Sequence, residues 1–368
     1  MIKRILRILG LAILLVLLYV VIVLVHGTLT DYQPEAVIQI ESDQNGSPEP
    51  QIADSLLSFM IWNLGYGGLG AESNFFYDKG GMFFSGGRMV RSSESLVTKN
   101  VDGILTTIQE NPADFYLLQE VDFNSKRSYG INEYEQVMSQ LDNYQATFAP
   151  NYKAPRVPLP IFEPWKAYGR VLSGLASYSR FSPTDSKRLQ LPGSFPWPTR
   201  VFQLDRCAEV QRYPTSSGKE LIVVNVHNSA YDSGGALKKQ QMDFLRELLL
   251  EAYEAGNYVI VGGDWNQCPP FFKFDSFVKE NPLGYTQINI DPAFLPDDWK
   301  WVYDPTIPTN RKAGDIYKPG ETFETLIDFF LISPNVQALS VRGIPLKFAF
   351  SDHQPVFMEV LLKDFSNQ

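Results

Sequence analysis

The chain has 368 residues, of which 44% are hydrophobic and 20% are charged, a balance that fits a globular protein with a sizeable core and excludes intrinsic disorder. A formal net charge of −9 argues against general binding of polyanions through a basic surface. Two cysteines, Cys207 and Cys268, exclude a disulfide scaffold and a four-cysteine zinc site, and they leave open whether these two thiols pair.

The first predicted element is an uncharged apolar run from Ile8 to Val25, preceded by the basic residues Lys3, Arg4 and Arg7. The run is long enough to cross a bilayer with help from its flanks. Basic residues at its N-terminal side predict that end in the cytoplasm and the bulk of the chain outside. A cleaved signal peptide is the alternative, but the run is long for one and no small-x-small site follows it. We therefore predict a single-pass protein of the cell membrane, anchored by residues 1–30.

A polar, acidic segment over residues 31–54 follows the anchor, with an Asn-Gly-Ser-Pro-Glu-Pro stretch at its centre. This composition predicts a flexible tether, which would hold the next domain on the order of 25–30 Å from the bilayer. The remaining chain, residues 55–368, shows no repeat, no low-complexity block and no second domain boundary. We expect it to form one domain.

The domain begins with an apolar strand, Leu56–Asn63, that ends on an asparagine. A glycine-rich, aromatic loop, Gly65–Arg91, comes next, and a loop of this length in a compact domain is usually functional or mobile. Apolar residues with helical spacing between Val97 and Ile108 then predict a helix that Pro112 closes. A second buried strand, Phe115–Glu120, ends on a polar pair.

The second half of the chain is richer in strands. The predicted elements, in order, are a short helix near 133–141, a Pro-rich and aromatic segment over 150–164, strands at 172–178, 207–213 and 220–226, a helix over 237–252 terminated by Gly256, and strands at 258–261 and 325–332 before a last strand after residue 353. Alternating helices and strands followed by strands predict an α/β domain whose strands pack between helical layers.

Polar side chains stand at or near the ends of five of these apolar strands. They are Asn63, Glu120, His227, Asp264 with Asn266, and Asp352 with His353. Gly262 and Gly263 stop the strand before Asp264, so the carboxylate and the amide two positions later are delivered by a strand end, where ligands gather in α/β folds. A sixth polar residue, Asp328, lies inside an apolar strand and needs a partner, for which His353 is the natural candidate.

Each of these residues also has a plainer interpretation. The carboxylates and Asn63 are common in turns and caps, and a histidine at a strand end is often a satisfied core residue. The set taken together favours a functional site, because two of the only three histidines in the chain belong to it. The third, His26, lies beside the apolar run and is expected at the membrane interface.

In order and in approximate spacing, these motifs resemble the endonuclease/exonuclease/phosphatase superfamily of metal-dependent phosphoesterases, which includes deoxyribonuclease I. The motifs are Trp62-Asn63, Leu118-Gln119-Glu120, Val226-His227, Gly263-Asp264-Trp265-Asn266, Ile327-Asp328 and Ser351-Asp352-His353-Gln354-Pro355-Val356. The resemblance spans residues 56–363. It implies a four-layer α/β sandwich, in which two packed, mostly antiparallel sheets are flanked by helices, after the transmembrane helix.

The resemblance also implies a divalent metal, Mg²⁺ or Mn²⁺. Glu120 would be its principal ligand, with Asn63 and Asp352 close by. The metal would polarise the phosphoryl oxygens and offset charge in the transition state.

The remaining residues of the set have catalytic roles in this family. His353, oriented by Asp328, would act as general base for the attacking water. Asp264 would orient or activate the nucleophile, and Asn266 would bind a phosphate oxygen. His227 would donate a hydrogen bond to the phosphate or to the leaving oxygen.

The chain departs from the family at one point. Members with a histidine at the position of His227 often orient it with a carboxylate from a neighbouring strand, and residues 165–184 contain no acidic residue. We therefore expect His227 to bind phosphate rather than to act as a tuned acid.

The substrate stays open between a phospholipid head group, a sugar or other small phosphate, and nucleic acid, and no protein partner is predicted. The sequence Leu326-Ile327-Asp328-Phe329 lacks the inositol phosphatase signature. Aromatic loops at 195–198, 271–272 and 299–301 suit contact with lipid or stacking on a sugar, with packing at the rim of the fold as the plainer alternative. The competing function is a membrane-tethered binding module that kept the fold and lost catalysis.

Overall fold

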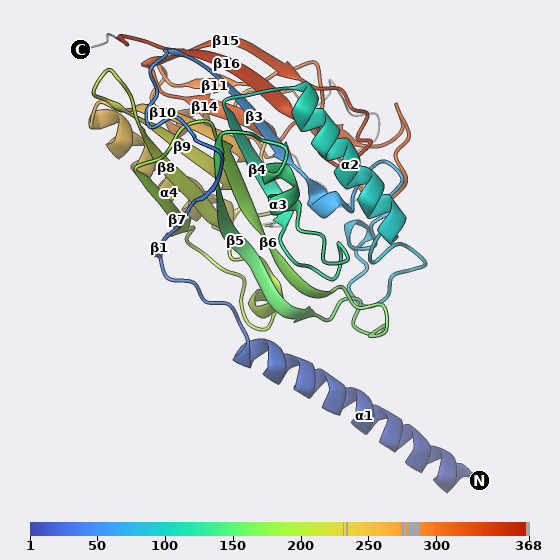
Figure 1. The fold of residues 1–368 in the computed structure, drawn as a ribbon. Coiled ribbons are helices and arrows are strands. Elements are labelled where there is room, and N and C mark those ends of the chain that lie inside the picture. The colour runs from blue at the N-terminus through green and yellow to red at the C-terminus, as the bar shows by residue number, and fades with distance from the viewer. Residues whose placement is uncertain (231, 233–234, 274–276, 278–287, 366–368) are drawn as a thin grey trace.

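The computed structural model describes residues 1–230, 232, 235–273, 277 and 288–365 (Figure 1). Two seven-stranded sheets form its centre. The first has the order β1 (Val37–Gln39), β7 (Asp185–Gln190), β8 (Cys207–Pro214), β9 (Glu220–His227), β10 (Tyr258–Asp264), β14 (Asp328–Ile332), β11 (Lys300–Val302). The second has the order β15 (Val336–Gly343), β16 (Val356–Leu362), β3 (Leu56–Asn63), β4 (Phe115–Asp122), β6 (Gly169–Ser179), β5 (Tyr144–Val157), β2 (Asp43–Asn45).

The helices complete the layers. Helix α1 spans Ile2–Leu29, α2 Glu94–Glu110, α3 Glu133–Met138 and α4 Ala236–Glu254, and a small two-stranded sheet pairs β12 (Asn310–Arg311) with β13 (Glu324–Thr325). Figure 1 shows α2 and α4 on opposite sides of the paired sheets. The predicted four-layer sandwich with mostly antiparallel sheets is therefore confirmed.

The strands at the centre are buried on both faces, which is why they are apolar throughout. In β3, Phe59 and Ile61 pack between the sheets against Ile260 of β10, while Met60 faces the layer of α2, where it packs with Ile104. Every second residue of β9 and β10 faces away from the other sheet and packs against α4. These residues form a third apolar cluster, in which Leu245 and Leu249 of the helix are fully buried. The period of two along each strand thus produces three stacked cores.

Two parallel strand pairs bring the polar strand ends to one edge of the sandwich. Strand β3 runs parallel to β4, and β9 runs parallel to β10, with His227 in register with Asp264. Strand β14 runs antiparallel to β10 and pairs Asp328 with Asp264. Asp328 is therefore the first residue of its strand, and the prediction that it lies inside one is wrong because Leu326 and Ile327 fall between β13 and β14.

The glycines before Asp264 do not end their strand as predicted. Strand β10 continues through Gly262 and Gly263 to Asp264. Gly263 has a φ of 142°, and a Cβ there would lie 2.1 Å from the carbonyl oxygen of Val226. Glycine lets β10 approach β9 this closely, and the approach draws Asp264 toward His227.

The segment predicted as a flexible tether is instead paired with both sheets. Strand β1 pairs with β7, and β2 pairs with β5, so each strand extends one sheet at its edge. Ile52 is fully buried. A chain that makes these backbone hydrogen bonds is not a coil, so the end of α1 is held against the domain rather than at a distance from it.

Helix α1 is the one helix in the described part of the chain that is long and apolar enough to span a membrane. The most apolar part of this helix, with a mean hydropathy of 3.4, has no buried residues. The structure also answers the question about the cysteines, since Cys207 and Cys268 are both buried and form no disulfide. Strands β5, β7, β11, β12 and β15 were not anticipated from the sequence.

One carboxyl group lies between the two sheets. Glu209 of β8 is 1% exposed and accepts hydrogen bonds from the hydroxyls of Thr147 and Ser177 on the opposite sheet. Burial raises the pKa of Glu209 to about 7, against the lowering effect of these hydrogen bonds. The folded protein therefore favours the neutral carboxylic acid at this position.

This raised pKa predicts that stability falls as the pH rises from about 4.5 to about 7. Over that interval the folded state retains a proton that the unfolded state has lost. Replacing Glu209 with the neutral Gln removes this contribution. Relative to the wild type, we expect Glu209→Gln to gain roughly 2–3 kcal/mol in free energy of unfolding between pH 5 and pH 8. Urea denaturation of the full chain in detergent measures the free energy of unfolding of both proteins at pH 5 and pH 8, with the exposed Glu251→Gln as control. If the difference between variant and wild type is the same at both pH values, the prediction is wrong.

Candidate active site

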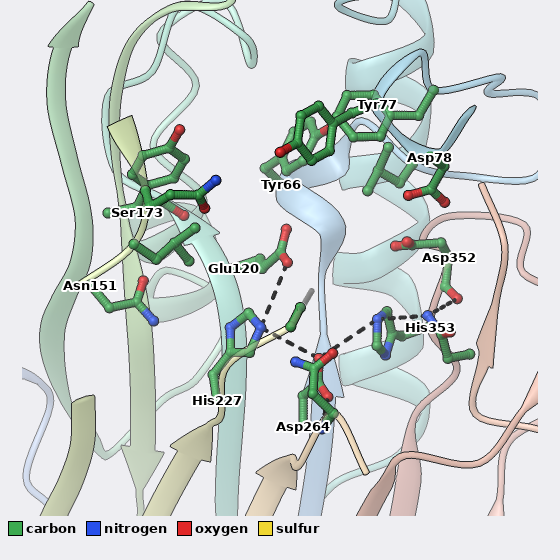
Figure 2. Close-up of a pocket in the computed structure, with 18 of the residues that line it drawn as sticks. Tyr66, Tyr77, Asp78, Glu120, Asn151, Ser173, His227, Asp264, Asp352 and His353 are labelled. Atoms are coloured by element: carbon green, nitrogen blue, oxygen red, sulfur yellow. Dashed lines mark hydrogen bonds and ion pairs between the residues drawn. The ribbon is translucent and has the colours of Figure 1, made fainter. Parts of the chain in front are cut away.

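A cavity of about 510 Å³ opens at the edge where β3, β4, β9 and β10 end (Figure 2). All of the predicted site residues except Asn63 and Asp328 line it, and those two contact residues that do. The structure thus brings together side chains from six separate motifs. The predicted residues that line the cavity are Glu120, His227, Asp264, Asn266, Asp352 and His353.

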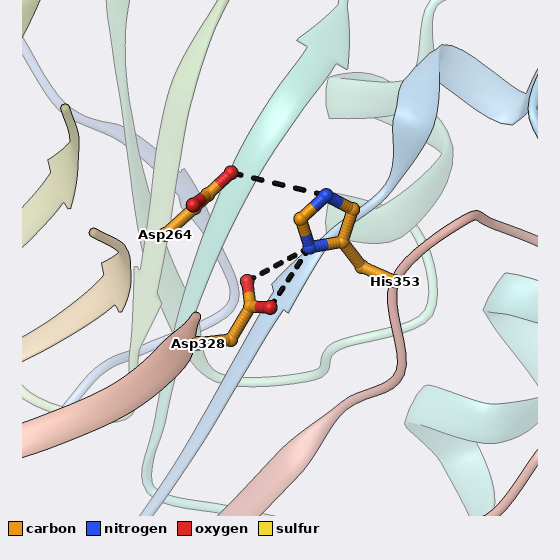
Figure 3. A group of neighbouring side chains, drawn as sticks. All are labelled: Asp264, Asp328 and His353. Carbon is orange, nitrogen blue, oxygen red and sulfur yellow. Dashed lines mark hydrogen bonds and ion pairs between the residues drawn. The ribbon is translucent and has the colours of Figure 1, made fainter. Parts of the chain in front are cut away.

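The predicted pairing of Asp328 with His353 is present. The Nδ1 atom of His353 lies 2.8 Å and 3.0 Å from the two carboxylate oxygens of Asp328, and both side chains are buried (Figure 3). The hydroxyl of Thr309 accepts hydrogen bonds from the backbone N–H groups of Ile327 and Asp328, which fixes the start of β14. The carboxylate therefore orients the imidazole with Nδ1 toward β14 and Nε2 toward the cavity.

His353 is held as a cation by the carboxylates around it. Burial lowers the pKa of His353, but Asp328, through its charge and hydrogen bond, and then Asp264 and Asp352 more than offset burial and raise the pKa to about 10. The Nε2 atom lies 3.8 Å from an oxygen of Asp264 and 2.9 Å from the amide nitrogen of Asn310. The surrounding carboxylates thus favour the protonated imidazole, whereas the amide N–H of Asn310 can donate to Nε2 only when that nitrogen is unprotonated.

Asp264 occupies the centre of the site. One oxygen of its carboxylate, Oδ2, lies 3.4 Å from Nε2 of His227 and accepts a hydrogen bond from the amide of Asn63 at 3.1 Å. The other, Oδ1, accepts the backbone N–H of Asn266 at 2.8 Å. Burial and the nearby Asp328 raise the pKa of Asp264 to about 6, while His353 lowers it. Asp264 consequently loses its proton near pH 6. A general base is most effective when its pKa lies close to the working pH.

Glu120 is aimed into the cavity by an irregular backbone. The ladder between β4 and β6 shifts register between Leu118 and Val121, and Glu120 has a φ of 51°. A non-glycine residue in this region is uncommon and is strained unless the surrounding structure holds it. The bulge turns the Glu120 side chain out of the sheet plane, to within 3.9 Å of Nε2 of His227. Figure 2 shows this carboxylate in the middle of the cavity.

Glu120 and Asp352 form a second acidic pair in the cavity, and among the described residues no lysine or arginine forms an ion pair with either, although the charges of His353 and Arg311 reach Asp352. Burial raises the pKa of Asp352 to about 7, His353 lowers it, and the charge of Glu120 raises it again. Carboxylate oxygens are hard ligands of the kind that Mg²⁺ and Mn²⁺ prefer. The donor chemistry and the electrostatic repulsion between these two residues therefore fit a divalent metal ion.

Asn63 does not present its amide oxygen to this pair. The oxygen accepts the backbone N–H of Gly65 at 3.0 Å, and the amide nitrogen faces Asp264 and, at 3.5 Å, Glu120. In this orientation the Asn63 amide positions the carboxylates, and its expected place beside a metal stays a prediction. Asp264, Asp328 and His353 also form a group that by composition could hold a metal ion. Their hydrogen bonds and ion pairs account for that group without one.

His227 and Asn266 complete the phosphate side of the site. Burial, with Arg206 and His353 nearby, lowers the pKa of His227 well below its ordinary value, so its imidazole is neutral. Its buried Nδ1 has no hydrogen-bond partner among the described residues. This agrees with the absence of an acidic partner in residues 165–184. Asn266, with a φ of 51°, donates its amide N–H to the carbonyl oxygen of Asn228 and lines the cavity.

Several cavity residues were missed from the sequence. Asn310 lies beside His353, and Lys238 donates from α4 to the carbonyl oxygen of Asn266 at 3.0 Å. The buried guanidinium of Arg127 pairs with Asp122 and stacks 3.7 Å from the centre of the Tyr66 ring. None stands at the end of a predicted strand. Of these residues, only Tyr66 could have been suspected from the sequence, because the glycines beside it mark the start of the long loop. Two of those glycines have positive φ in the structure.

A two-sheet sandwich with acidic residues and histidines gathered at its strand ends has the architecture of a phosphoester hydrolase. The chain belongs to the Endonuclease/Exonuclease/phosphatase family, whose sequence model matches residues 62–353. This assignment confirms the resemblance drawn from the motifs. The family consists of phosphoester hydrolases that generally depend on a divalent metal.

Solved structures share the fold at low sequence identity. An endonuclease/exonuclease/phosphatase from Beutenbergia cavernae is 16% identical with a TM-score of 0.54, and the match covers 84% of this chain and 72% of that one. ANGEL2, a 2′,3′-cyclic phosphatase, is also 16% identical, with a TM-score of 0.52 over 90% of this chain and all of that one. No curated protein matches this chain in sequence. At these identities the likeness extends to the fold alone.

The acidic pair predicts opposite effects of one substitution with and without metal. Asp352→Asn removes a half-buried carboxylate whose charge is disfavoured by desolvation and by Glu120, so in EDTA we expect the variant to melt at or above the temperature of the wild type. In saturating Mn²⁺ the wild type should gain stability, about 2.7 kcal/mol at 100 times the Kd, and the variant should gain much less. Thermal denaturation in detergent measures both, with the exposed Asp243→Asn as control. An equal gain in both proteins would exclude Asp352 as a ligand.

Proposed function

We propose that this chain is a membrane-anchored, divalent-metal-dependent phosphoesterase that hydrolyses a phosphate ester by in-line attack of a water molecule. One observation carries the proposal. Asp264 lies between the neutral His227 and the charged His353, and all three face the acidic pair Glu120 and Asp352 across a single cavity. This arrangement supplies an anionic base, proton donors and metal-binding oxygens around one point, as phosphoryl transfer requires.

Glu120 and Asp352 would hold the metal, either Mg²⁺ or Mn²⁺. When bound, the ion would polarise the phosphoryl oxygens and offset the charge of the transition state. Asn63, which donates to Glu120 and Asp264, keeps these carboxylates in place. The strained backbone at Glu120 is consistent with a carboxylate held in position before the metal arrives.

We place the general base at Asp264, ahead of His353, which we expected from the sequence. Asp264 lies between the two histidines, and with a pKa of about 6 it can accept a proton from the attacking water at neutral pH. The surrounding carboxylates favour the protonated form of His353, which would donate from Nε2 to a phosphoryl oxygen, with Asp328 stabilising its charge. His227 and Asn266 would donate to the remaining phosphate oxygens or to the leaving oxygen.

The alternative function, an inactive binding module on the same fold, predicts that at least one of these positions has been lost. All of them are present and converge on one cavity, which supports the enzyme. The substrate class is left open by these residues, because they handle the phosphate and not the group that carries it. A phospholipid, a small phosphate and a nucleic acid all fit the chemistry.

Substitution of the proposed base tests the function. We expect Asp264→Asn to lower kcat for bis(p-nitrophenyl) phosphate or p-nitrophenyl phosphate by about 10²–10⁴-fold, because water then has no positioned proton acceptor. Asp243→Asn, an exposed carboxylate on α4, is the control and should keep full activity. The wild type should lose activity in EDTA and recover it with Mg²⁺ or Mn²⁺. Activity that survives in Asp264→Asn, or in EDTA, would refute the mechanism.

The proposed location is the cell membrane, crossed once by α1, with the catalytic domain on the non-cytoplasmic side. The basic residues at the N-terminal end of α1 support this orientation. Because Cys207 and Cys268 are buried, a new surface cysteine reports the side without interference. A membrane-impermeant maleimide added to spheroplasts of the expression host should label Ser95→Cys on α2. It should label Ile2→Cys, at the start of α1, only after lysis. The reverse pattern would invert the topology.

A further inference from the structure

Three loops carry exposed aromatic side chains, and the same three loops line the cavity. The loop after β3 contributes Phe75 and Tyr77 to the cavity wall, the connection from β5 to β6 contributes Leu159, and the connection from β7 to β8 contributes Phe202 and Leu204. The exposed large apolar residues of these loops are Met82 (40%), Phe83 (52%), Phe84 (60%), Phe162 (43%), Trp165 (72%) and Trp197 (56%), which we call the aromatic rim.

The first two loops are joined into one ordered surface. The backbone N–H of Phe162 donates to the carbonyl oxygen of Phe83 at 3.0 Å, and Ile161 donates to Met82 at the same distance. The rings of Phe83 and Phe162 stack with their centres 5.7 Å apart, and Phe84 lies 5.4 Å from Phe162. Exposed apolar rings that are fixed in place by backbone hydrogen bonds mark an interaction surface.

The third loop contacts the last turn of the predicted membrane helix. The indole N–H of Trp197 donates to the hydroxyl of Thr28 at 3.0 Å. The ring of Phe202 packs on Gly27, where a Cβ would lie 2.8 Å from it. Phe202 therefore touches α1 and lines the cavity at once. If α1 crosses a bilayer, Trp197 stands where α1 leaves it, the depth at which tryptophan is enriched in membrane proteins.

The contact of Trp197 and Phe202 with α1 indicates which partner the aromatic rim contacts. Figure 1 shows α1 leaving the domain at the end opposite β15 and β16, beside the yellow-green segment before β8 that carries Trp197. A bilayer crossed by α1 lies directly against that segment. The rim lies on the same loops that line the cavity, so a bilayer that met the rim would lie close to the cavity.

The inside of the cavity suits a ligand with an apolar part. Beyond the catalytic carboxylates and histidines, much of its wall is aromatic or aliphatic, formed by Tyr66, Tyr152, Val157, Tyr168, Phe202 and Leu204. A volume of about 510 Å³ is in the range that accepts a drug-sized molecule, well beyond a bare phosphate. The polar catalytic groups and this apolar wall match a phosphate ester attached to a hydrophobic group.

We propose that the aromatic rim docks on the bilayer crossed by α1, and that the substrate is a phospholipid whose phosphate ester lies at that surface. The inference rests on the proposed phosphoesterase activity. Docking would turn the cavity toward the lipid head groups. A water molecule would attack the phosphorus, the bond from phosphorus to the leaving oxygen would break, and that oxygen would take up a proton.

The tryptophans provide a test of docking that is independent of activity. Of the six, Trp62, Trp265 and Trp299 are buried and Trp301 is half-buried, so Trp165 and Trp197 dominate any contact with lipid. The full chain is reconstituted in phosphatidylcholine vesicles with brominated acyl chains, which quench indole fluorescence on contact. We expect Trp165→Phe to remove a large part of the quenching seen in the wild type. Equal quenching in both proteins would overturn the docking.

Activity tests the substrate. The triple variant Phe83→Ser, Phe162→Ser, Trp165→Ser should lose about tenfold or more of the hydrolysis of lipids in vesicles of phosphatidylcholine, phosphatidylethanolamine and phosphatidylglycerol, because the lost apolar area weakens docking. Its hydrolysis of soluble bis(p-nitrophenyl) phosphate should stay within about twofold of the wild type. Leu339→Ser, an exposed leucine on β15 at the far end of the domain, is the control and should change neither rate.

The outcomes separate the two proposals. Wild-type protein that cleaves the soluble ester but no vesicle lipid overturns the phospholipid assignment and leaves the phosphoesterase standing. A triple variant that loses both rates equally, or neither, overturns the role of the rim. Wild-type protein that cleaves neither substrate with Mg²⁺ or Mn²⁺ refutes the proposed function itself.

Discussion

The site depends on the pairing of two carboxylates across neighbouring strands. The register of β10 and β14 sets Asp264 opposite Asp328, and like charges at such positions repel each other. His353 lies between them, bonded to Asp328 and 3.8 Å from Asp264, and its positive charge makes the pair tolerable in a buried place. The same arrangement raises the pKa of Asp264 to about 6 and that of His353 to about 10. The proposed roles of base and proton donor therefore rest on one cross-strand constraint.

The second acidic pair, in the described part of the chain, has no histidine bonded between its members. Glu120 and the half-buried Asp352 share the cavity, and the pKa of Asp352 is raised to about 7. The backbone at Glu120 adopts an unusual conformation that aims its carboxylate into the cavity. Repulsion and strain at one point are characteristic of a functional site rather than of a stable core. Under the proposed function, a divalent metal ion would neutralise this second pair as His353 neutralises the first.

The sequence was informative where a residue's chemistry conflicted with its surroundings. Asp328 among apolar residues required a partner, and the partner was His353. The apolar strands and their polar ends predicted an α/β domain with a functional edge, and the resemblance to the phosphoesterase family implied the two-sheet sandwich. The sequence did not reveal Asn310, because a short strand in a long connection has no periodicity. The prediction was wrong at Gly263, where glycine allows two strands to approach closely and does not end its strand. It was also wrong at residues 31–54, where a polar composition concealed two edge strands.

Those edge strands change what the membrane anchor can do. A flexible tether would let the domain rotate freely and reach substrates in solution as well as at the surface. Strands β1 and β2 instead fasten the chain after α1 to both sheets, and Trp197 and Phe202 fasten the end of α1 itself. The direction in which the cavity faces is then coupled to the direction of α1. If α1 spans a membrane, this coupling would hold one side of the domain toward the bilayer. The exposed rings on the loops that line the cavity would then meet lipid rather than water.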